Sequence, residues 1–196
     1  MPLPGKAWFH VTIGTYASWL PGDTRGFRTR HHRIHSSGDH RHPPPQEEHA
    51  GLRRRHADRQ ATVIPSHLRE TVGRTFVDHL RRLNHRLLVI SVSGMHAHLL
   101  VELPKAFGTA DHEIGRCKQA VALRVRGQID QKLWAKGCGV KPIRDAGHQR
   151  NTLAYIERHG HEGAWVWSFR GAVDQDGGGA APELRTGGLS VGEGGA

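Results

Sequence analysis

Two histidines separated by a single residue, His96 and His98, begin the stretch HAHLLVEL. The alternation of side chains in this stretch is typical of a strand. Because successive side chains of a strand point to opposite faces, both imidazoles lie on one face and Ala97, Leu99 and Val101 on the other. Two adjacent imidazoles can hold one metal ion. The spacing alone is a weak signal, since a chain this rich in histidine produces roughly one or two such triplets by chance.

The same triplet occurs twice more, at His40–His42 and at His159–His161. The first lies in a stretch rich in Pro and Arg, and the second lies at the end of an expected helix. Only His96 and His98 therefore have strand alternation to orient them, and they are the candidate metal pair.

A tyrosine and a histidine share one face of an expected helix. Tyr155 and His159 are four residues apart in NTLAYIERHGHEGAW, a spacing that places both side chains on the same side of a helix. A phenol and an imidazole can thus reach a neighbouring site together. Because the chain has only 2 tyrosines, Tyr16 and Tyr155, few residues can serve as a tyrosine nucleophile.

The elements that must position these residues follow from the hydrophobic pattern. Strands are expected at 8–15, at 87–92 and 96–103 as a hairpin, and irregularly at 134–144. Amphipathic helices are expected at 66–83, 109–129 and 148–159. This order predicts an α+β fold: a ferredoxin-like antiparallel sheet with helices on one face and an added C-terminal helix that carries Tyr155.

Composition bounds the rest of the chain. The 28 Lys and Arg exceed the 18 Asp and Glu, which gives a net charge of +10 and indicates nucleic acid as partner. One domain is expected at 1–170, with 28–62 as a basic insertion rich in His, Arg and Pro and 171–196 as a Gly-rich disordered tail. The sequence has no long apolar run and no CxxC pair, so we expect a cytoplasmic protein without membrane spans.

Together these motifs resemble the single-tyrosine HUH transposases of the insertion-sequence two-hundred type and their REP-associated tyrosine transposase relatives. The resemblance rests, in order, on FHVTIGTYASWLPGDTRGF, GMHAHLLVELP with its hairpin, the stretch 134–144, and HQRNTLAYIERH. It implies a divalent metal ion, Mg²⁺ or Mn²⁺, bound by His96, His98 and His159, with Tyr155 as the nucleophile.

The third ligand departs from the family, in which it is often an amide side chain. His161 and His10 are therefore rivals of His159 for that place. A set of three imidazoles suits Mn²⁺ or a later transition ion better than Mg²⁺, which prefers oxygen ligands.

The resemblance further implies a transposase: a metal-dependent single-strand DNA endonuclease and strand transferase that acts through a 5′-phosphotyrosine intermediate in DNA transposition and recombination. It would act on single-stranded or hairpin DNA, without a nucleotide cofactor, as a monomer or a homodimer. Two alternatives stay open: a host-adopted hairpin-DNA-binding protein without transposition activity, and a metal-dependent nuclease that uses water. The candidate DNA contacts are Arg53, Arg54, Arg55, Arg81, Arg82, Arg86, Arg124 and Arg126.

Overall fold

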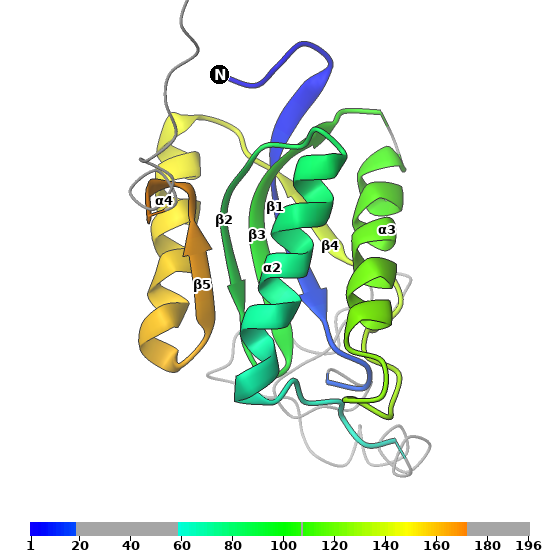
Figure 1. The fold of residues 1–196 in the computed structure, drawn as a ribbon. Helices are drawn as coiled ribbons and strands as arrows, with labels where there is room; N and C mark the ends of the chain where they lie inside the picture. Colours follow the sequence, from blue (N-terminus) through cyan, green and yellow to red (C-terminus); the bar gives the residue numbers. More distant parts are fainter. Residues whose placement is uncertain (19–58, 107, 172–196) are drawn as a thin grey trace, which may run out of the picture.

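The hairpin expected from two apolar segments around a short turn forms the centre of the sheet. In the computed structural model, which describes residues 1–18, 59–106 and 108–171, β2 (Leu87–Val92) pairs antiparallel with β3 (His96–Pro104). On the other side of β3 lies β1 (Lys6–Gly14), followed by β4 (Gly139–Pro142). Together with β5 (Trp165–Ser168) next to β2, these strands form an antiparallel sheet in the order β4-β1-β3-β2-β5 (Figure 1).

Two helices connect these strands and lie side by side on one face of the sheet (Figure 1). α2 (Ser66–Arg82) follows β1, and α3 (Thr109–Arg124) follows β3. The order β1, α2, β2, β3, α3, β4 is the ferredoxin-like one that the sequence pattern predicts.

The main core fills the space between these helices and the sheet. The alternation of β3 directs Ala97, Leu99 and Val101 into this core, each with no exposed surface. The largest fully buried side chains that the helices contribute are Phe76, Leu80 and Ile114. This layer buries most of the apolar surface and therefore supplies most of the stabilisation.

The helix that carries Tyr155, α4 (Ala146–Arg158), lies on the opposite face of the sheet from α2 and α3. Asp145 caps its start by accepting a hydrogen bond of 2.7 Å from the backbone N–H of His148. Leu153 and Ile156 pack this helix onto a second, smaller core. The sheet residues of that core are Trp8, Val89 and Leu100.

A fifth strand follows α4, which the sequence pattern did not predict. After the 3₁₀ turn η1 (His159–Glu162), β5 pairs with β2, and the ring of Trp165 lies directly against Gly73 of α2. A Cβ on residue 73 would overlap that ring, so glycine is required there. The Arg69 guanidinium donates to the carbonyl of Gly163 at 2.5 Å and holds the turn from the same helix.

One helix and one strand are shorter than the sequence pattern predicts. The helix expected at 109–129 ends at Arg124, because the chain turns at Gly127, whose positive φ of 80° a continuing helix does not allow. The strand expected at 134–144 is regular only from Gly139 to Pro142, while Trp134 forms an isolated bridge with Thr15.

The basic insertion and the Gly-rich tail fall almost wholly outside the described residues, so the domain boundaries stay predictions. The backbone N–H of Thr62 donates to the carbonyl of Tyr16 at 2.8 Å, and that of Ile64 donates to Gly94 at 2.7 Å. The first bond holds the two flanks of the insertion next to one another, and the second ties the C-terminal flank to the turn between β2 and β3. Within the described ranges, none of the helices is long and apolar enough to cross a membrane.

Candidate active site

Three imidazoles converge on the α4 face of the sheet. His96 and His98 point there because the alternating residues of β3 enter the main core, and His159 arrives as the first residue after α4. One potential ligand atom of each lies within 4.8 Å of the others. The rings of His98 and His159 are stacked, with 5.0 Å between centroids and 2° between planes. His96, His98 and His159 are called the histidine trio below.

His98 is anchored from β1. Its Nδ1 lies 3.1 Å from Nε2 of His10 and 3.2 Å from Oγ1 of Thr12. Both partners belong to the polar face of β1, which is paired with β3. Nδ1 is thus occupied, and Nε2 is the nitrogen left for a ligand.

His159 is anchored by the turn that follows it. Its Nδ1 lies 2.9 Å from a carboxylate oxygen of Glu162. Its Nε2 is buried and has no hydrogen-bond partner among the described residues. Because a buried polar atom without a partner is costly, this nitrogen is available for a ligand that enters the trio.

Burial keeps two members of the trio neutral. It lowers the pKa of His98 from 6.5 to about 3, with further lowering by the neighbouring His96, His10 and His159. Burial also lowers the pKa of His96, with His159 as a second cause. Both imidazoles are therefore unprotonated at pH 7, which is the form that binds a metal ion.

These features fit a divalent cation. Each of His98 and His159 has one nitrogen held by a protein partner and the other left open, which is the usual arrangement of metal-binding histidines. A set of nitrogen donors suits Mn²⁺ and later transition ions more than Mg²⁺. The trio would thus supply three ligands to such an ion, which would polarise a substrate oxygen bound to it.

Tyr155 borders the trio from one turn earlier in α4. Its ring is edge-on to His159, with 4.9 Å between centroids, and to His98, with 5.6 Å. It also faces His10 at 5.9 Å. With 38% of its surface exposed, Tyr155 is accessible to a substrate.

Neither of the two rivals for the third ligand position belongs to the trio. His161 is exposed in η1 and is not a member of the trio. His10 lies behind His98, at Nδ1, so it contacts one candidate ligand from the side away from the open Nε2. The geometry thus favours His159 as the third ligand.

The arginines expected to contact DNA are dispersed. Arg81 and Arg82 lie at the C-terminal end of α2 and Arg124 at that of α3, which are helices of the opposite face. Arg126 follows α3, and the run Arg53 to Arg55 lies outside the described residues. Among the described residues, the structure therefore does not gather these arginines around the trio.

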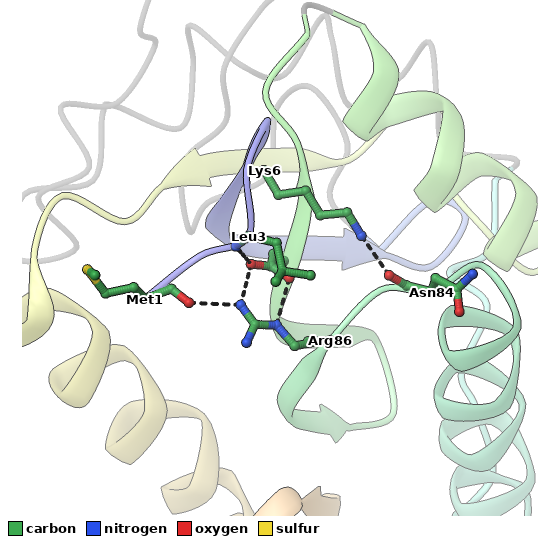
Figure 2. Close-up of polar contacts among 6 residues, drawn as sticks. Met1, Leu3, Lys6, Asn84 and Arg86 are labelled. Atoms are coloured by element: carbon green, nitrogen blue, oxygen red, sulfur yellow. Dashed lines mark hydrogen bonds and ion pairs between the residues drawn. The ribbon is translucent and has the colours of Figure 1, made fainter.

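Arg86 has a structural partner. Figure 2 shows it beside Met1 and Leu3, where it donates to the Met1 carbonyl at 2.9 Å. It also makes two bonds, of 2.6 and 2.7 Å, to the carboxylate of the fully buried Glu102, which in turn accepts from the backbone N–H of Leu3. This ion pair ties the start of the chain to the sheet, so Arg86 is not freely available to DNA.

Other residues near the trio were missed by sequence reasoning. Lys141 of β4 is in register with His10, and its charge contributes to lowering the pKa of His10 after the larger effect of burial. The guanidinium of Arg158 lies 6.0 Å from the Tyr155 ring. The alternation of β1 could have revealed Thr12, which shares the face of His10, but the register of β4 has no signature in the sequence.

Comparisons with known proteins do not place the chain in a family. No protein-family model matches it, and no curated protein does. Among solved structures, it is similar to one described as a REP-associated tyrosine transposase bound to a REP hairpin. That similarity has a TM-score of 0.48 and 11% identity, and covers 98% of this chain and 96% of the other. At this level the likeness assigns neither a family nor an activity.

Proposed function

We propose that the protein is a transposase-like enzyme that nicks and joins single-stranded DNA through Tyr155, with a divalent metal ion held by the histidine trio. One observation carries the proposal: an accessible phenol lies against three converging imidazoles, two of them on β3 and the third on the same helical segment as the tyrosine. A phenol and a cation site together meet the needs of phosphodiester cleavage by a protein nucleophile.

In the proposed reaction, the Tyr155 oxygen attacks the phosphorus of a DNA phosphodiester. The new bond joins Tyr155 to the 5′ phosphate, and the bond from phosphorus to the 3′ oxygen breaks. The phenol releases its proton to water, and the departing 3′ oxygen takes one up. Because the phosphodiester is kept as a phosphotyrosine, attack by a 3′-hydroxyl can rejoin strands without an added energy source.

A bound divalent ion would polarise the scissile phosphate and offset the negative charge that grows on its oxygens. The remaining tasks fall to the chain. α4 holds Tyr155 beside the trio by burying Leu153 and Ile156, which limits the motion of the nucleophile. Arg158 and Lys141, both close to the site, offer positive charge to the flanking phosphates.

We propose that Tyr155 serves the trio of its own chain. α4 packs on the sheet that carries His96 and His98, and β5 returns the chain to the same sheet. Trp165 against Gly73 and the Arg69 bond to Gly163 fix the turn after His159. A single protomer therefore contains every residue of the proposed site.

The test is a covalent adduct. Protein is incubated with 5′- and 3′-labelled single-stranded hairpin DNAs with randomised flanks, with Mn²⁺, with Mg²⁺ or with EDTA, and is resolved on a denaturing gel. We expect a metal-dependent band in which the 5′ phosphate is linked to protein. Tyr155→Phe should lose this band and the cleavage, by on the order of 10⁴-fold or more, with DNA affinity nearly intact.

The chain offers a matched control, because Tyr16 is the other of its 2 tyrosines. Tyr16→Phe should retain the adduct. Cleavage without an adduct would instead indicate a nuclease that uses water. Tight hairpin binding without cleavage across the randomised pool would indicate a binding protein, and either result would overturn the proposed mechanism.

A further inference from the structure

Two side chains of β1, His10 and Thr12, contact the same ring nitrogen of His98. His10 Nε2 and Thr12 Oγ1 both lie within hydrogen-bond distance of Nδ1 of His98, at 3.1 and 3.2 Å. Their positions are fixed by the pairing of β1 with β3, in which Thr12 is directly opposite His98. Two polar groups thus converge on the side of the ring away from the trio.

The tautomer of His98 decides whether the trio can bind a cation. In a neutral imidazole one nitrogen carries the hydrogen and the other offers a lone pair. If Nε2 carried the hydrogen, it would point where none of the described residues accepts a hydrogen bond, and its lone pair would be lost as a ligand. If Nδ1 carries it, either β1 partner can accept, and Nε2 is free.

We propose that His10 and Thr12 are positioning residues that hold His98 as the Nδ1–H tautomer, so that its Nε2 faces the cation position of the trio. The inference rests on the proposed function for the presence of a metal ion, but the tautomer exists without one. It assigns His10 a role that excludes it as a metal ligand: its Nε2 accepts the hydrogen of His98.

His159, on the other side of the trio, is oriented in the same way by a partner at its Nδ1. Glu162 lies 2.9 Å from Nδ1 of His159 and directs the Nε2 of that ring inward. The rings of His98 and His159 are parallel within 2°. Two ligands are thus oriented by separate partners, one on a strand and one in a turn, before any ion binds.

The tautomer is measured first, in metal-free protein with ¹⁵N-labelled histidine at pH 7.5, from the long-range ¹H–¹⁵N correlations of the imidazoles. His98 is assigned from its absence in His98→Gln. We expect the Nδ1–H pattern in the wild type and a shift toward Nε2–H in the double variant H10F/T12V. An Nε2–H pattern for His98 in the wild type would overturn the proposal.

The second readout is Mn²⁺ affinity, measured by calorimetry without DNA. H10F/T12V should bind Mn²⁺ about 10- to 100-fold more weakly, which is the usual range for removal of such partners. H10Q/T12V, in which the amide oxygen at position 10 can accept the same hydrogen, should restore most of the affinity. The matched control is His112→Phe, an exposed histidine of α3 on the opposite face, which should change nothing.

Failure of the proposal and failure of the proposed function are distinguishable. If the wild type binds Mn²⁺ and H10F/T12V, folded by circular dichroism, binds it equally well, the positioning role is wrong and the proposed function stands. If the wild type shows the Nδ1–H tautomer but binds no Mn²⁺, the positioning role stands and the proposed metal-dependent function fails.

Discussion

The two faces of the sheet differ in what neighbouring residues of β3 do. Toward α2 and α3, Ala97, Leu99 and Val101 are fully buried in the main core. Toward α4, His96 and His98 lie next to the imidazole of His159 and the phenol of Tyr155. One residue of sequence separates a stabilising contact from a candidate ligand, so single substitutions can tell the two roles apart.

The energetics of the two faces also differ. Apolar side chains gain free energy as they leave water, whereas a buried imidazole loses hydration that its partners only partly replace. The pKa of His98, lowered to about 3 mainly by burial, reflects that loss. The imidazoles of the α4 face are therefore expected to contribute to activity and little to stability, and the main core the reverse.

For the comparison of the two faces of β3, the largest expected effect is that of His98→Ala. We expect Mn²⁺ affinity to fall by more than about 100-fold, beyond the range seen for residues that only orient a ligand. The midpoint of thermal unfolding should stay the same or rise, because a poorly solvated imidazole is removed. Calorimetry and a melting curve on one preparation check both, and an unchanged affinity would remove His98 from the site.

Substitution of the next residue, Leu99→Ala, should lower stability and leave metal affinity nearly unchanged. Deleting this fully buried side chain should lower the free energy of unfolding by about 2–5 kcal/mol. Mn²⁺ affinity of the folded protein should remain within about threefold of wild type. Urea titration and calorimetry provide the two values, and a loss of metal affinity as large as that of His98→Ala would break the separation between the faces.

The effect that is smallest at neutral pH is a dependence of stability on pH, because it develops only below about pH 6.5. Unfolded His98 takes up a proton below about pH 6.5, whereas the folded residue does so only near pH 3. Between these values the unfolded state carries more protons, so stability falls as the pH falls, by about 1.4 kcal/mol per unit from His98 alone. Urea titrations of wild type and His98→Ala from pH 7 to pH 4 should diverge in slope. Parallel slopes would contradict the shifted pKa.

Much of the fold could be predicted because it depends on local patterns. Alternation placed His96 and His98 on the face away from the main core, and the spacing of four placed Tyr155 and His159 together on a helix. The ferredoxin-like order followed from the sequence of elements. Strand β5 was missed because Trp165 to Ser168 is short and is held by its contacts with β2 and Gly73, which no local pattern encodes.

The parts of the site that escaped prediction depend on register between distant strands. His10 could be placed on the polar face of β1, but its contact with Nδ1 of His98 follows from pairing across 88 positions. Lys141 enters through the register of β4 with β1. The expected arginines were chosen by charge alone, and charge does not tell which face of a helix or which end of a strand a residue occupies.

The bond between Thr62 and Tyr16 has a consequence for how this protein can change over evolution and in the laboratory. The parts of the chain that precede and follow residues 19–58 meet at one hydrogen-bonded point. The entropy of closing a flexible loop grows only slowly with its length, by about 0.6 kcal/mol for each doubling. Evolution can therefore lengthen, shorten or replace the intervening segment while β1 and its histidine keep their places. The same point is a natural position at which to graft a foreign peptide or a second domain.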